Sequence, residues 1–64
     1  MIRDYILSMG GYPRYTYHGT LRGAKKECRV IYKDEMKTGR RVIIQTGGEV
    51  ISEHFERGWI DYQI

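Results

Sequence analysis

The spacing of hydrophobic and polar residues changes along this chain and divides it into three parts. In the first part, residues 3–9 and 14–18 are rich in β-favouring side chains and lie on either side of Gly10-Gly11, which predicts a β-hairpin. Pro13 follows the turn and has no backbone N–H to donate to a neighbouring strand. This hairpin is therefore expected to contribute an edge strand.

From Thr20 the apolar period lengthens to 3.6 residues, which predicts a helix that extends to Met36. Thr20 can cap the start of this helix, and Gly39 can close its end in a left-handed conformation. One arc of the helix is apolar and is expected to face the core: Leu21, Ala24, Cys28, Ile31, Tyr32 and Met36.

The third part predicts a second hairpin, with strands in residues 41–46 and 49–56 around a Gly47-Gly48 turn. This turn sets Ile44 opposite Ile51. The face expected to meet the helix then consists of Val42, Ile44, Ile51 and Phe55. Residues 57–64 could extend the last strand or return across the sheet, and the pattern leaves both courses open.

These elements predict an α+β fold of β-β-α-β-β order, in which one helix packs on one face of a four-stranded antiparallel sheet. The 64 residues form a single domain, 1–64. So short a chain buries a small core with little room for a deep substrate cleft. One cysteine permits no intramolecular disulfide, and no apolar run is long enough for a membrane span or a signal peptide, so we expect an intracellular protein.

Charge is distributed unevenly, although the net charge is only +3. Residues 22–41 hold most of the bases, and on the predicted helix five of them follow each other at steps of three and four along one side. These five bases are Arg22, Lys26, Arg29, Lys33 and Lys37. The row is either a solvated helix face or a binding surface for phosphates or for an acidic protein.

Six tyrosines are many for 64 residues, and three of them lie in the first hairpin near Arg14. These three are Tyr12, Tyr15 and Tyr17. Tyrosine and arginine supply much of the binding energy in protein interfaces, and tyrosine also stacks on unpaired bases. The alternative for each tyrosine is a place in the core. Taken together, the trio and Arg14 are predicted to belong to a partner-binding face.

Catalytic and metal sites are not predicted. Cys28, His18 and His54 are too few to supply the four ligands of a structural zinc site. Cys28 also falls on the apolar arc of the helix, where a nucleophile would be buried. The glycines occur in turns and not in a phosphate-binding loop. We therefore expect a protein that is not an enzyme and that uses no cofactor.

Three segments of the chain are considered together: the helix start Thr20–Lys26, the strand Arg41–Ile44 and the ending Arg57–Tyr62. They resemble small phage and prophage accessory proteins, among them inhibitors of type I CRISPR–Cas surveillance complexes, the anti-CRISPR proteins. The resemblance implies a β-β-α-β-β fold, a location in the host cytoplasm and inhibition by stoichiometric binding. The implied partner is a host defence protein complex, with a Cas surveillance complex as the expected example. Many inhibitors that mimic DNA are acidic, whereas this chain is basic.

Three functions follow as hypotheses. The first is a phage-encoded, anti-CRISPR-like inhibitor that binds through the helix bases and the neighbouring strands. The second is a small basic nucleic-acid-binding module that uses the same bases and the hairpin tyrosines. The third is a structural phage protein that associates with itself through an open sheet edge. Both monomer and homodimer are compatible with the sequence.

Overall fold

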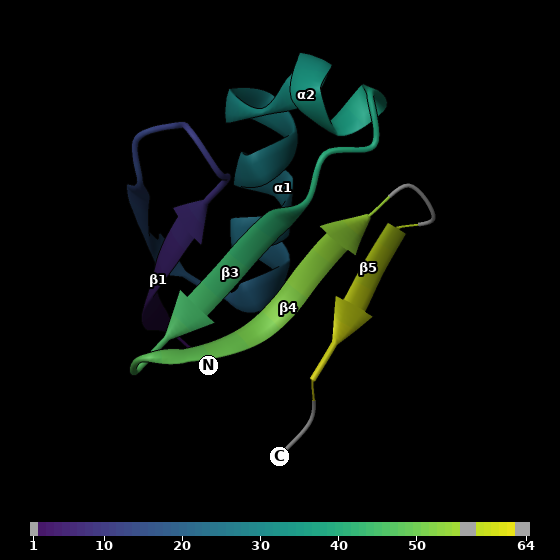
Figure 1. Ribbon diagram of the computed structural model, residues 1–64. Helices are drawn as coiled ribbons and strands as arrows, with labels where there is room; N and C mark the ends of the chain where they lie inside the picture. Colours follow the sequence, from purple (N-terminus) through teal and green to yellow (C-terminus); the bar gives the residue numbers. More distant parts are fainter. Residues whose placement is uncertain (1, 56–57, 63–64) are drawn as a thin grey trace.

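The computed structural model describes residues 2–55 and 58–62 of the chain. A five-stranded antiparallel sheet and a layer of two helices make up the fold, which is α+β as predicted (Figure 1). In chain order the elements are β1 (Arg3–Ser8), β2 (Tyr15–Gly19), α1 (Leu21–Ile31), α2 (Lys33–Lys37), β3 (Val42–Thr46), β4 (Glu49–Phe55) and β5 (Gly58–Asp61).

The sheet has the strand order β2-β1-β3-β4-β5, so the predicted four strands and their β-β-α-β-β order are wrong. The missed strand is β5, which returns antiparallel to β4 with Trp59 opposite His54. Of the segment whose course was open, Arg57, Gln63 and Ile64 lie outside the described residues. β2 lies at one edge of the sheet, which confirms the edge strand expected in the first hairpin.

The predicted single helix is divided at Tyr32, where the backbone leaves helical geometry with φ −117° and ψ 30°. The Tyr32 hydroxyl donates to the carbonyl oxygens of Leu7 and Pro13, at 3.3 and 3.4 Å. The side chain is thereby tied to β1 and to the loop after it, and the helix axis changes direction at this point (Figure 1). No helix among the described residues is long and apolar enough to cross a membrane.

Both predicted ends of the helical segment are confirmed. The Thr20 hydroxyl accepts a hydrogen bond from the Gly23 N–H at 3.1 Å and caps α1. After α2, Gly39 adopts a φ of 81° and donates its N–H to the Met36 carbonyl. The helical layer begins and ends where the sequence predicts.

The core lies between the sheet and α1, which packs over β1, β2 and β3. Its buried hydrophobic residues are Tyr5, Leu7, Met9, Ala24, Cys28, Tyr32, Val42 and Ile44. Three of the six predicted arc positions are fully buried, and Leu21, Ile31 and Met36 pack against the core from its margin. The apolar arc therefore faces the sheet as expected, in two helices and not in one.

A β-bulge between β3 and β4 changes the predicted register. Ile44 lies opposite Ser52, and the ladder shifts by one residue between Ile44 and Gln45. Ile51, the expected partner of Ile44, is the extra residue and packs at the margin of the core. Past the bulge His54 lies opposite Val42, so Phe55 alternates to the far face, and its predicted place beside Val42 is wrong.

Candidate functional site

The bases of α1 and α2 line two adjoining hollows between the helices and strands β4 and β5. The first has a volume of about 520 Å³ and the second about 280 Å³, and they share Arg29. We call this surface the basic groove. It consists of Thr20, Arg22, Gly23, Lys25, Lys26, Arg29 and Trp59 in the first hollow and of Arg29, Lys33, Met36, Lys37 and His54 in the second.

The groove exists because the helices are set to one side of the sheet. α1 makes its main sheet contacts with β1, β2 and β3, so β4 and β5 lie to the side of this contact. His54 and Trp59 are cross-strand partners on these two strands, and their rings meet edge-on with centroids 5.0 Å apart. They provide an aromatic floor beneath the row of bases.

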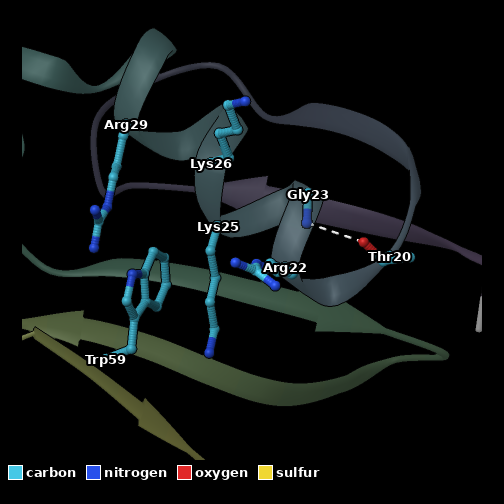
Figure 2. Close-up of a pocket in the computed structure, with 7 residues that line it drawn as sticks. All are labelled: Thr20, Arg22, Gly23, Lys25, Lys26, Arg29 and Trp59. Carbon is cyan, nitrogen blue, oxygen red and sulfur yellow. Dashed lines mark hydrogen bonds between the residues drawn. The ribbon is translucent and has the colours of Figure 1, made fainter.

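Side chains from α1 extend toward this floor. Arg29 and Lys25 reach down from the helix on the side of Trp59, whereas the amine of Lys26 points away from it (Figure 2). Lys25 Nζ lies 5.5 Å from the centroid of the Trp59 ring, within cation–π range. The first hollow therefore combines an indole with several cationic groups.

Among the described residues, Asp61 forms an ion pair with a base of the groove. Lys25 Nζ pairs with the Asp61 carboxylate, with N–O distances of 2.8 and 3.0 Å, and Ser52 Oγ donates to the same carboxylate at 2.6 Å. The hydrogen bonds from Lys25 and then from Ser52 lower the pKa of Asp61. Asp61 therefore neutralises the charge of Lys25, and the ion pair links β5 to α1.

The five bases predicted as a row differ from Lys25 in this respect. Within the described residues, no carboxylate forms an ion pair with Arg22, Lys26, Arg29, Lys33 or Lys37. The first turn of α1 also contains no acidic residue, although a helix N-terminus favours negative charge. Burial, and then the nearby charge of Arg29, lower the pKa of His54. Apart from Lys25, the groove therefore concentrates positive charge that no carboxylate of the described residues neutralises.

The structure brings together the five helix bases predicted as a partner-binding row. Arg22, Lys26 and Arg29 line the first hollow, and Arg29, Lys33 and Lys37 line the second. Although the helix is divided at Tyr32, Arg29 belongs to both hollows and keeps the row continuous.

The predicted hairpin residues lie elsewhere. Tyr12 and Tyr15 are exposed and meet the Tyr32 ring edge-on, with centroids 6.3 and 5.9 Å away. Tyr17 packs toward the core, and Arg14 is exposed in the loop before β2. None of the four lines the groove. The predicted set therefore separates into a helix part, which forms one surface, and a hairpin part, which does not join it.

Sequence reasoning missed Lys25, His54 and Trp59 as groove residues. Trp59 packs against the core from its margin, and the return of β5 beside β4 also brings it into the groove. Lys25 lies one position from the predicted row, on the side of α1 that faces β5. The single tryptophan of the sequence was the available signal, but only the return of β5 beside β4 places it near the helix bases.

Residues 2–55 and 58–62 contain no group of three or more His, Cys, Asp or Glu side chains arranged to hold a metal ion. Burial raises the pKa of the Cys28 thiol to about 12, so this cysteine is protonated at neutral pH. A protonated, buried thiol is a poor nucleophile.

Neither the family models, nor the curated proteins, nor the solved structures with which this chain was compared give a match. The resemblance to anti-CRISPR proteins therefore stays a prediction.

Proposed function

We propose that this protein is a small nucleic-acid-binding module and that the basic groove is its binding surface. The observation that carries the proposal is the set of five bases that share the groove and have no carboxylate partner among the described residues. Like charges held this closely repel one another, and a phosphate backbone relieves that repulsion.

The geometry supports a nucleic acid better than a compact acidic ligand. The two hollows follow each other along α1 and α2, so the positive surface is elongated. An aromatic side chain borders each hollow, Trp59 in the first and His54 in the second. Rows of cations interleaved with aromatic rings are typical of nucleic-acid-binding surfaces.

The test is binding of labelled nucleic acid, measured by fluorescence anisotropy at several salt concentrations. Affinity is expected to fall steeply as salt rises, because bound phosphates release counterions. Arg29→Glu is expected to weaken binding about tenfold or more and to flatten the salt dependence. Arg14→Glu makes the same charge change outside the groove and serves as the control. Absence of binding at low salt, or equal losses in the two variants, would contradict the proposal.

The second candidate is the anti-CRISPR-like inhibitor suggested by the resemblance. It is favoured by the sheet face opposite the helices, where exposed apolar side chains occur that nucleic acid would not use, among them Ile6, Val50 and Ile60. A purified type I surveillance complex should then bind the protein and lose its target DNA. Inhibition unaffected by reversing Arg29 and Lys33 to Glu would remove the groove from that mechanism.

A further inference from the structure

We infer that the first hollow of the basic groove holds an unpaired nucleobase of a single strand, stacked on Trp59, while α1 binds the flanking phosphates. The inference rests on the proposed function and specifies which form of nucleic acid the groove takes. Three features of the hollow carry it: the identity of the aromatic residue, the way its ring is held, and the charges around it.

Trp59 packs against the margin of the core, but that packing does not require the N–H group of an indole. Its Nε1 is buried and has no hydrogen-bond partner among the described residues. A buried N–H without an acceptor costs stability, and a phenylalanine would fill much of the same space without that cost. An indole does offer the largest aromatic surface for stacking on a base.

The ring is held in place before any ligand arrives. His54 packs edge-on against it from β4, and the Lys25 ammonium lies 5.5 Å from its centroid. Lys25 is itself fixed by Asp61, which Ser52 holds from the neighbouring strand. A stacking surface that is fixed in advance loses little side-chain entropy on binding.

The hollow has the size and lining that a base and its phosphates require. A volume of about 520 Å³ falls within the range of sites for small organic ligands. Trp59 lies on the sheet side, and Arg22, Lys26 and Arg29 lie on the helix side, free of carboxylate partners among the described residues (Figure 2). A base on the indole would thus place its backbone near the cations.

A duplex would satisfy only part of this arrangement. Its phosphates could reach the exposed bases of α1, but its bases are paired and stacked with each other and could not enter the hollow beside Trp59. Comparing a duplex with a single strand therefore separates two contributions to the binding affinity. Any strand supplies the electrostatic contribution, whereas only unpaired bases supply the stacking contribution. That difference is measurable.

The experiment compares three probes of equal length, about ten nucleotides, on the unmodified protein. The probes are oligothymidine, an abasic sugar-phosphate strand and a blunt duplex. Trp59 is the only tryptophan, so its fluorescence reports directly on the hollow. Oligothymidine is expected to quench Trp59 and to bind roughly 5- to 150-fold more tightly than the abasic strand, which corresponds to one stacked base.

The possible outcomes separate the two proposals. If oligothymidine and the abasic strand bind equally, the stacking inference is overturned and the electrostatic function survives. If the duplex binds as tightly as oligothymidine and quenches Trp59 equally, the preference for an unpaired base is also refuted. If no probe binds at low salt, both proposals fail.

A pair of variants adds a structural control, read by anisotropy of labelled strands. Trp59→Leu is expected to remove the preference for oligothymidine and to keep the affinity for the abasic strand. Trp59→Phe should keep most of the preference, since it retains an aromatic face. Tyr15→Leu, in the exposed part of the hairpin, should leave the preference unchanged. A preference that persists in folded Trp59→Leu would overturn the inference, and if that variant does not fold, the probe comparison on the unmodified protein decides.

Discussion

At the scale of single residues, Gly23 and Tyr17 determine how closely α1 approaches β2. A Cβ atom added to Gly23 would clash with the Tyr17 hydroxyl oxygen and would lie 3.0 Å from Cζ of its ring. Both contacts are closer than van der Waals contact. The absence of a side chain at position 23 therefore allows Tyr17 to pass beneath the start of the helix.

Gly23→Ala is expected to destabilise the protein by about 1 kcal/mol. Overpacking costs roughly 1–3 kcal/mol, while exchanging a helical glycine for alanine returns up to about 1 kcal/mol. In a Tyr17→Leu background the clash is gone, so the same exchange should stabilise. Urea unfolding of the four proteins tests this reversal of sign, with Gly10→Ala, which meets open space, as the control. Equal effects in both backgrounds would show that Tyr17 is not the obstacle.

Cys28 gives a second prediction at this scale. Burial raises the pKa of its thiol to about 12, so iodoacetamide should label the native protein at least roughly 100-fold more slowly than the protein in denaturing urea. The unfolded thiol ionises near its ordinary pKa of 9.0, and the native thiol does not. Stability should consequently fall as pH rises above that value. Rapid labelling of the native protein would contradict this account.

At the scale of the elements, α1 has a charge arrangement that is unfavourable for a helix. Arg22 lies in its first turn, where no acidic residue is present, and Lys25 and Lys26 follow three and four positions later. The helix dipole and the spacing both oppose positive charge here. A helix selected only for stability would carry an acidic residue at this end.

Arg22→Glu is therefore expected to raise the free energy of unfolding by roughly 0.3–1 kcal/mol while it weakens nucleic-acid binding. Thermal or urea unfolding gives the first quantity, and anisotropy gives the second. Arg14→Glu, outside the helix, should change neither by a comparable amount. A variant that is both more stable and equally active in binding would mean that the first turn of α1 takes no part in the groove.

At the scale of the whole molecule, the contact between Lys25 and Asp61 joins the helical layer to the last strand. Asp61 has a folded pKa below its ordinary value of 3.8, so its contribution to stability is present above that pH and is lost as pH falls through the folded value. Asp61→Asn should be less stable than the unmodified protein near neutral pH and equally stable in strong acid.

The same variant makes a prediction about binding, because it releases Lys25 from its counter-ion. Affinity for nucleic acid is expected to rise even though stability falls. The measurements are urea unfolding at several pH values and anisotropy at neutral pH, with the exposed residue Glu49 changed to Gln as the control. A stability difference that does not vary with pH would contradict the assigned role of the carboxylate.

Features with a local physical cause could be predicted from the sequence. Thr20 as a cap, Gly39 as a helix stop and the Gly47-Gly48 turn depend on backbone geometry within a few residues, and all three are confirmed. The row of helix bases was predicted for the same reason, because helical periodicity alone places its members on one side.

Features that depend on contacts between distant residues could not be predicted. Tyr32 leaves the helix where its hydroxyl meets Leu7, 25 residues away. The bulge in β4 shifts the register by one residue, which no turn signal reveals. Trp59 joins the helix bases only because β5 returns beside β4. The residue pattern within single helices and strands therefore could not predict that aromatic residues belong to the groove.

The outermost position of β5 has one more consequence. Within the described residues β5 pairs only with β4, on one side, and the Lys25–Asp61 contact links it to α1. A ligand bound between Trp59 and α1 would add a further contact to β5. Backbone amides of Gly58–Asp61 should then exchange with solvent deuterium sooner than those of β1 in the empty protein, and binding should slow their exchange most.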